Sequence, residues 1–296
     1  MVSAPTAFNI ATAITPCAYI TLTVISLCSS FIPWLNSLAS HGKTRQSNPT
    51  LVLNDRNRSL IELLNHKCLL VAKRRFTDFY AFGLIWSALV LGFRLDLTST
   101  VMYCHFIRRY YECRYIHQWR DAKMHVAGYI LGYIHYIFLP FIFVPDIPKN
   151  ESFCLGVIAV GVNFMAQREQ FLHHRILAKC RTEDHTKEYK IPCGRLFTYV
   201  CCPHYTAEIL IYSTFLVLGY RGSGEYEFEK SFDNTENIIA IDFLNQCGRF
   251  IPYRHFILFI WVISNLAVSA HSNHRWYCTQ FSSYPKGRAK LFPFIW

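Results

Sequence analysis

The sequence carries little charge for its length. Only 17% of its 296 residues are Asp, Glu, Lys or Arg, whereas soluble domains carry about 25%. The first 40 residues contain no charged side chain. Because a secretory signal peptide begins with a basic region, this stretch is not expected to be cleaved. The low charge and the 52% of hydrophobic residues argue against an ordinary soluble domain.

The motifs that usually hold nucleotides or metals are also absent. The sequence contains neither a Walker A motif nor G-x-G-x-x-G, so any nucleotide would be bound outside a P-loop or a Rossmann turn. The 12 Cys residues show no paired C-x-x-C spacing typical of zinc sites. The pairs His173/His174 and His271/His274 lack the acidic partner of an H-E-x-x-H motif. We therefore predict no metal site, with a histidine-bound metal as the weaker alternative.

Long apolar runs, by contrast, are present along most of the chain. Runs of this kind predict transmembrane helices, although one of them is short. The predicted segments are Ala7–Leu38, Phe79–Phe93, Leu97–Ile107, Met124–Val144, Ser152–Gln167, Val200–Tyr220 and Pro252–Ser272. The sequence thus predicts an all-α membrane protein, with residues 1–296 forming a single domain built as a seven-transmembrane-helix bundle.

The distribution of basic residues predicts how this bundle is oriented. With seven spans, the loops on one side hold 23 Lys and Arg and those on the other side hold 5. By the positive-inside rule the first side is cytosolic, which makes the N-terminus luminal and the C-terminus cytosolic. The basic loops are 41–77, 108–123, 174–195 and 274–296, and the others are 94–100, 145–152 and 221–251. Residues 221–251 are therefore predicted to form a luminal loop.

Polar residues gather at the predicted cytosolic ends of the helices. Such residues are costly near a bilayer and are often functional. Five groups occur: His41–Arg45; Gln170, His173, His174 and Arg175; Arg181, Tyr189, Lys190 and Arg195; His204, Tyr205 and Glu208; and His271, Asn273, His274, Arg275 and Tyr277. Together they would form a cytosolic-face pocket whose cations suit a phosphorylated cofactor. Arg108, Arg109 and Arg114 are interpreted instead as anchors at the membrane interface.

Several stretches carry a family resemblance. The end of the chain reads His274-Arg275-Trp276-Tyr277, then Tyr284-Pro285-Lys286. Upstream stand Tyr189-Lys190-Ile191-Pro192 and Cys202-Pro203-His204-Tyr205, the latter followed by Ala207-Glu208. These motifs resemble the steroid 5-alpha-reductase family, and the stretch from Cys202 to Glu208 is similar to the form in its polyprenol reductase branch. Residues 174–296 hold the most specific part of the resemblance.

The resemblance implies a multi-pass enzyme of the endoplasmic reticulum membrane that uses NADPH. It implies polyprenyl and membrane lipids as partners, with no nucleic acid and no obligate protein partner. The implied cofactor contacts are Lys43, Gln170, His174, Arg181, Tyr189, Lys190, His204, Asn273 and Tyr277. His274 falls on a family histidine near the reaction centre, so we predict it as hydrogen-bond donor or acid. Glu208 and His105 are predicted to support it.

The chemistry favours an aldehyde substrate. Hydride can add to a double bond only if the resulting charge is stabilised, and the carbonyl of polyprenal provides an enolate for this purpose. We therefore expect reduction of the alpha-isoprene double bond of polyprenal to dolichal, which would supply dolichol for protein N-glycosylation. Phe106 stands where steroid-reducing members have a tyrosine, which argues against a steroid substrate. A steroid reductase, an isoprenylcysteine methyltransferase-like enzyme and a seven-helix receptor are the alternatives.

Overall fold

The computed structural model describes residues 4–32, 69–144, 153–182, 189–220 and 253–293. Lys43 and the predicted luminal loop 221–251 lie outside the described residues. The elements are α1 (Ala4–Ser29), β1 (Leu70–Ala72), η2 (Lys73–Arg75), α5 (Phe76–Val90), α6 (Leu97–Tyr111), η3 (Glu112–Ile116), β2 (Lys123–His125), α7 (Val126–Ile142), α8 (Phe153–Thr182), η4 (Arg195–Thr198), α9 (Pro203–Tyr220) and α11 (Tyr253–Gln280). Within the described ranges the chain is mostly helical, as predicted, and each predicted apolar segment coincides with an α-helix.

Three helices extend beyond the predicted apolar segments. α6 continues past Ile107 to Tyr111, α8 continues past Gln167 to Thr182, and α11 continues past Ser272 to Gln280. These extensions carry charged and polar side chains, which end an apolar run in sequence but do not end a helix. At its start, α6 is fixed by Asp96, whose carboxylate accepts hydrogen bonds from the Ser99 backbone N–H at 3.1 Å and hydroxyl at 2.8 Å.

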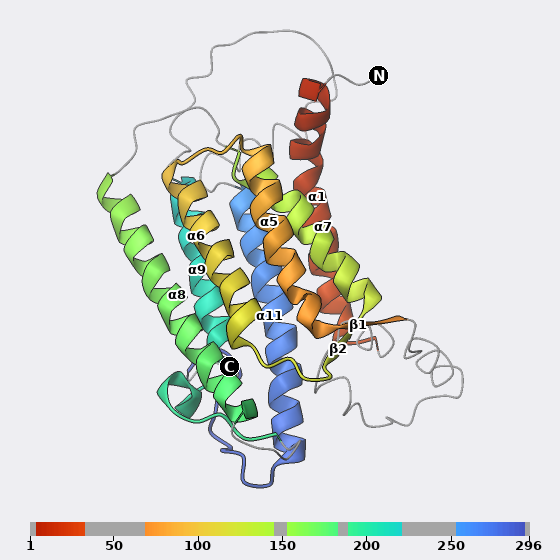
Figure 1. Ribbon diagram of the computed structural model, residues 1–296, viewed down its shortest axis with the longest axis vertical. Helices are drawn as coiled ribbons and strands as arrows, with labels where there is room; N and C mark the ends of the chain where they lie inside the picture. The colour runs from red at the N-terminus through yellow and green to blue at the C-terminus, as the bar shows by residue number, and fades with distance from the viewer. Residues whose placement is uncertain (1–3, 33–68, 145–152, 183–188, 221–252, 294–296) are drawn as a thin grey trace.

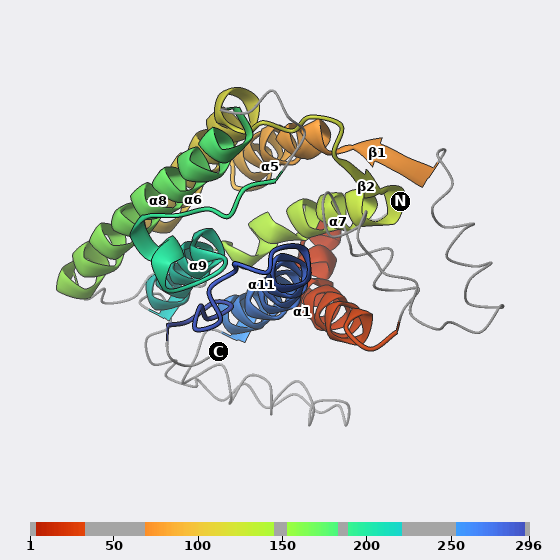
Figure 2. The ribbon, with the colours of Figure 1, turned by 90° about the horizontal axis from the view of Figure 1, so that it is seen from below.

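The helices run along the long axis of the molecule and alternate in direction (Figure 1). α1 packs against α7 and α11, α9 packs against α8 and α11, and α5 packs against α6 and α7. α6 also contacts α8, so the sequence of neighbouring helices closes into a ring, seen end-on in Figure 2. The antiparallel pair β1–β2 and the segment that follows α11 lie at one end of this bundle (Figure 1).

The close contact between α5 and α7 depends on two glycines. A Cβ added to Gly83 on α5 would lie 2.5 Å from the ring of Tyr136 on α7. A Cβ added to Gly132 on α7 would lie 2.6 Å from the ring of Phe79 on α5. Each helix therefore inserts an aromatic ring over a glycine of its neighbour. Small residues of this kind allow helices to approach closely where apolar driving force is weak.

The outer surface of the bundle is apolar on every α-helix that the structure describes. Large apolar side chains are exposed on all of them, including Ile14 and Val24 on α1 and Val157 and Met165 on α8. By length and composition, two helices could span a membrane: Phe8–Ser29 of α1 and all of α11. α7 is a shorter apolar helix. An apolar exterior of this extent marks a surface made to contact lipid or protein rather than water.

Candidate functional site

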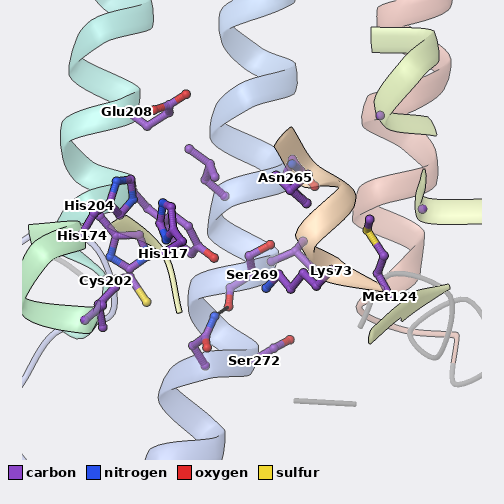
Figure 3. Close-up of a pocket in the computed structure, with 18 of the residues that line it drawn as sticks. Lys73, His117, Met124, His174, Cys202, His204, Glu208, Asn265, Ser269 and Ser272 are labelled. Carbon is purple, nitrogen blue, oxygen red and sulfur yellow. Dashed lines mark hydrogen bonds between the residues drawn. The ribbon is translucent and has the colours of Figure 1, made fainter. Parts of the chain in front are cut away.

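A cavity of about 490 Å³ lies inside the ring of helices, a volume typical of ligand sites. One side, which we call the polar wall, is formed by α8, α9 and the segment before α9, and it carries Gln170, His174, Tyr189, His204 and Glu208. The opposite side, the apolar wall, is formed by α1, α7 and α11, and it carries Leu22, Ile25, Leu131, Val262 and Leu266. Figure 3 shows the histidines and Glu208 of the polar wall across from Lys73 and Met124.

The structure brings most of the predicted cofactor contacts together in this cavity. Its lining includes Gln170, His174, Arg181, Tyr189, Lys190, His204, Asn273 and Tyr277. These residues come from α8, α9, α11 and the segment between α8 and α9, which are separated in sequence by up to a hundred residues. Lys43, the remaining predicted contact, lies outside the described residues.

The polar wall depends on a stripe of polar residues along α8. Asn163, Gln167, Gln170 and His174 are spaced three or four apart, so they share one helix face. All four are buried. Gln167 donates to the Asn163 side-chain oxygen at 2.5 Å, and Asn163 donates to the Thr214 hydroxyl of α9 at 2.6 Å. These bonds satisfy the polar groups against α9, which explains how this face of α8 remains buried although its side chains are polar.

Gln170 links three elements of the wall. Its side-chain oxygen accepts from Arg108 Nη2 at 2.5 Å. Its amide donates to the Glu208 carboxylate and to the His204 backbone carbonyl, the latter at 3.2 Å. The other Glu208 oxygen lies 3.6 Å from His105 Nε2. The structure therefore places Glu208 and His105 close together, but of these two only Glu208 lines the cavity, and Gln170 holds the Glu208 carboxylate in position.

Arg108 and Arg109 do not anchor the protein at a membrane interface, and the interpretation of these two residues was wrong. Both side chains point inward and share the carboxylate of Glu112, which is completely buried. Arg109 Nη1 lies 2.5 Å from Glu112 Oε2, and His174 Nδ1 lies 2.7 Å from the same oxygen. Arg114, by contrast, is exposed as expected for an anchor. The spacing of Glu112, three and four residues after the arginines, is the signal that could have revealed these pairs.

The charges in this cluster stabilise one another. Burial acts to raise the pKa of Glu112, but the nearby Arg109, the hydrogen bond from His174 and the charge of Arg108 outweigh it. The pKa of Glu112 therefore lies well below its usual range, and its carboxylate is ionised at neutral pH. Because Glu112 begins the π-helical turn η3, the local widening of the helix directs this carboxylate toward α8.

The same cluster contains ligand atoms that could hold a metal. One such atom each from Glu112, His117 and His174 lies within 4.8 Å of the others. Arg109 Nη1, however, approaches all three, at 2.5 Å from Glu112, 3.1 Å from His174 and 3.5 Å from His117. The guanidinium therefore fills the cation position that a metal would take. We assign the cluster to holding Arg109 in place.

His274 is not part of the cavity lining. Its Nε2 lies 3.0 Å from the backbone carbonyl of Arg288, to which it donates a hydrogen bond. Arg288 in turn donates to the Pro192 carbonyl at 3.2 Å, and Cys201 N donates to the Ala289 carbonyl at 2.7 Å. These contacts fasten the segment after α11 beneath the loop that precedes α9. His274 therefore joins α11 to the segment that follows it, and its catalytic role stays a prediction.

Two features of the cavity fit an anionic ligand, and one of them was missed in the sequence. Lys73, from η2, lines the cavity, and its side chain extends toward α11 in Figure 3. Burial, followed by repulsion from Arg181, lowers the pKa of Lys73 to about 7. Among the described residues no carboxylate forms an ion pair with it. In addition, His204 Nδ1 is buried and without a hydrogen-bond partner in the described part of the chain. Buried polar atoms nearly always have a hydrogen-bond partner, so this one is free to bond to a ligand in the cavity.

The fold and the cavity define a helical-bundle protein with an apolar exterior and an internal cavity lined by basic, imidazole and apolar side chains. The sequence profile of the 3-oxo-5-alpha-steroid 4-dehydrogenase family matches residues 115–228 and 247–296. The chain belongs to this family.

Curated relatives are similar over most of this chain. Polyprenal reductase 1 of Oryza sativa subsp. indica is 27% identical, over 73% of this chain and 64% of the rice protein. Polyprenal reductase of Saccharomyces cerevisiae is 27% identical, over 92% of this chain and 91% of the yeast protein. Polyprenal reductase of Danio rerio is 24% identical, over 76% of this chain and 79% of the fish protein. The chain thus spans less than two thirds of the rice relative and nearly all of the yeast one.

Proposed function

We propose that this protein is an NADPH-dependent polyprenal reductase. It reduces the alpha-isoprene double bond of polyprenal and gives dolichal on the way to dolichol. The observation that carries the proposal is the two-sided cavity, in which a polar wall with basic and imidazole groups faces an apolar wall. Such a cavity suits a charged cofactor and a lipid tail at the same time. The similarity to polyprenal reductases supports this substrate class.

The proposal places the bundle in the endoplasmic reticulum membrane with seven spans. The described loops of the basic side, including η3, β2 and the segment before α9, lie at one end of the bundle, together with the segment after α11 (Figure 1). The polar wall lies toward this end. By the positive-inside rule this end would face the cytosol, where reduced cofactor is available. The N-terminus would then be luminal.

The cofactor would be held by the polar wall and by the cations around it. Arg181, Lys190 and Lys73 line the cavity and would bind phosphate groups, since charge-assisted bonds to phosphate are the strong ones. Tyr189, His204, Asn273 and Tyr277 would contact the ribose and ring portions. Lys43 is proposed as a further contact on the grounds of resemblance. When bound, NADPH would supply the hydride that the reaction requires.

The remaining residues would bind and activate the lipid substrate. Its isoprenoid tail would lie along Leu22, Ile25 and Leu266, where burial of apolar surface stabilises binding. Glu208 and His105 would stand near the aldehyde end, and this pair would deliver the proton that the alpha carbon takes up. The enclosing helices would exclude water from the reacting atoms.

The activity can be tested with membranes from cells that express the full chain. Incubation with polyprenal and NADPH should yield dolichal, detected by mass spectrometry. Glu208→Gln should abolish most of this product. The control is Glu169→Gln, which alters an exposed ion pair with Arg195 and should leave the amount of product unchanged. Reduction of testosterone but not of polyprenal would favour the steroid reductase alternative and overturn the proposal.

A further inference from the structure

Tyr80, on α5, has a hydroxyl group in an unusual electrostatic setting. Its side chain is 5% exposed and lines the cavity. Arg109 donates two hydrogen bonds to its oxygen, from Nη2 at 2.9 Å and from Nε at 3.1 Å. The guanidinium carbon also lies 4.9 Å from the centre of the Tyr80 ring. The hydroxyl oxygen is therefore in direct contact with a fixed cation.

The cation is held in place by other groups. Arg109 is buried, and its Nη1 contacts Glu112 and His174, so Nε and Nη2 remain directed at the tyrosine. Because the oxygen of Tyr80 accepts both bonds, its own O–H proton is available for another acceptor. Among the described residues no side chain or carbonyl accepts that proton. The guanidinium beside the oxygen would stabilise the negative charge that develops there as the proton leaves.

The position of Tyr80 also distinguishes it from the other tyrosines nearby. Tyr80 lies between Arg109 and α7, where its ring contacts that of Tyr136 at a centre-to-centre distance of 5.7 Å. The Tyr129 hydroxyl, one helix away, already donates to Asp78 at 3.0 Å. The Tyr19 hydroxyl is bonded to His135 at 3.1 Å. Phe106, which precedes Arg109 by one turn of α6, has no proton to offer.

We infer that Tyr80 is the acid that polarises the substrate carbonyl, with Arg109 as the residue that activates it. This inference rests on the proposed function. As the beta carbon of the enal gains hydride from the bound cofactor, the electron pair of the double bond moves toward the carbonyl, and the oxygen takes the proton of Tyr80. The alpha carbon of the resulting enol then takes a proton from solvent or the Glu208–His105 pair. The enol O–H proton returns to the Tyr80 phenolate, which restores the tyrosine.

The inference is tested with Tyr80→Phe, which removes only the hydroxyl oxygen and its proton. Loss of an oxyanion donor of this kind lowers kcat by roughly 10²- to 10³-fold. NADPH affinity, measured by fluorescence titration, should stay within about threefold, and the thermal midpoint should stay close to that of the wild type. The isotope effect of NADPH deuterated at the transferred position should increase, because hydride transfer then limits turnover. Tyr129→Phe, which deletes a hydroxyl outside the cavity, is the matched control and should keep its kcat.

The outcomes separate this inference from the function on which it rests. If wild-type membranes leave polyprenal unreduced, the proposed function fails and the inference fails with it. If the wild type reduces polyprenal and Tyr80→Phe does so at an equal rate, the inference alone is overturned. It is also overturned if kcat falls only in proportion to lost NADPH binding or lost folded protein, because Tyr80 would then be a packing residue.

Discussion

Replacing Glu112 by Gln tests how the cluster beneath the cavity is stabilised. The change keeps the shape of the side chain but removes the charge that Arg108 and Arg109 share. The carboxylate is completely buried, and the two arginine side chains are only 17% and 10% exposed. The variant therefore leaves two buried cations next to each other without a counter-ion. Removing one partner from a buried pair costs about 3–5 kcal/mol.

The magnitude can be converted into a measurable shift. For a chain of this size, 1 kcal/mol corresponds to a thermal midpoint change of about 2–4 °C, so Glu112→Gln, at about 3–5 kcal/mol, should lower the midpoint by roughly 6–20 °C. The assay is thermal unfolding of the purified protein in detergent. Unfolding is detected by the labelling of thiols that are buried in the folded protein, such as that of Cys113. Since Arg109 also orients Tyr80, activity should fall further than the folded fraction does.

The matched control is Glu169→Gln. Glu169 is ion-paired with Arg195 at 2.5 Å, but these side chains are 29% and 41% exposed. Solvent-exposed pairs contribute about 0–1 kcal/mol, so the control should shift the midpoint by no more than about 4 °C. Equal shifts of the thermal midpoint for the two variants would refute the reasoning, because burial would then make no difference to how much a carboxylate contributes to stability.

Three further predictions concern other parts of the molecule. Lys73→Ala should weaken NADPH binding about 10- to 150-fold, the equivalent of a hydrogen bond to a charged group at about 1.5–3 kcal/mol. Because the pKa of Lys73 in the free protein is about 7, the affinity of the wild type for NADPH should fall as the pH rises through this value. Lys73→Arg stays charged, so its affinity should not depend on pH in this range. A wild-type affinity that does not change with pH would contradict the prediction. His274→Ala should keep kcat within about threefold and lower stability by about 0.5–1.5 kcal/mol, and a hundredfold loss of kcat at unchanged stability would restore its catalytic assignment. Gly132→Ala should destabilise the fold by about 1–3 kcal/mol, since its Cβ would meet the Phe79 ring, and an unchanged thermal midpoint would show that α5 and α7 can separate without cost.

The sequence predicted the helices better than it predicted their inner faces. Hydropathy locates the seven segments, because a run of apolar residues depends only on neighbours in sequence. It places the ends of α6 and α8 too early, since Arg108 and Gln170 look like solvent-exposed residues until their partners on other helices are known. The meeting of Arg109 with Tyr80, 29 residues earlier in the chain, depends on tertiary packing that no local pattern contains.

The sequence predicted which residues gather in the candidate site better than it predicted the role of each residue. Family motifs identify His204, Tyr189 and Glu208, and these residues do line the cavity. The same motifs assign chemistry to His274, whereas its contact with the Arg288 carbonyl fastens two segments of chain together. A motif records that a residue matters, and the structure is needed to separate a contact with the substrate from a contact that holds two segments of the chain together. Lys73 shows the opposite case, because nothing in its local sequence distinguishes it from the exposed Arg74 and Arg75 beside it.

The segment after α11 has a consequence for the order in which the protein is assembled. Residues 199–202 are bonded to residues 289 and 290, and Thr206 donates to the Leu291 carbonyl at 2.5 Å. During synthesis, the loop before α9 is complete long before these partners leave the ribosome. The six described helices that precede α11 can thus form while this end of the bundle is still unfastened. Competence to bind cofactor would then arise as a late maturation step, which a chain halted ahead of residue 289 could not reach.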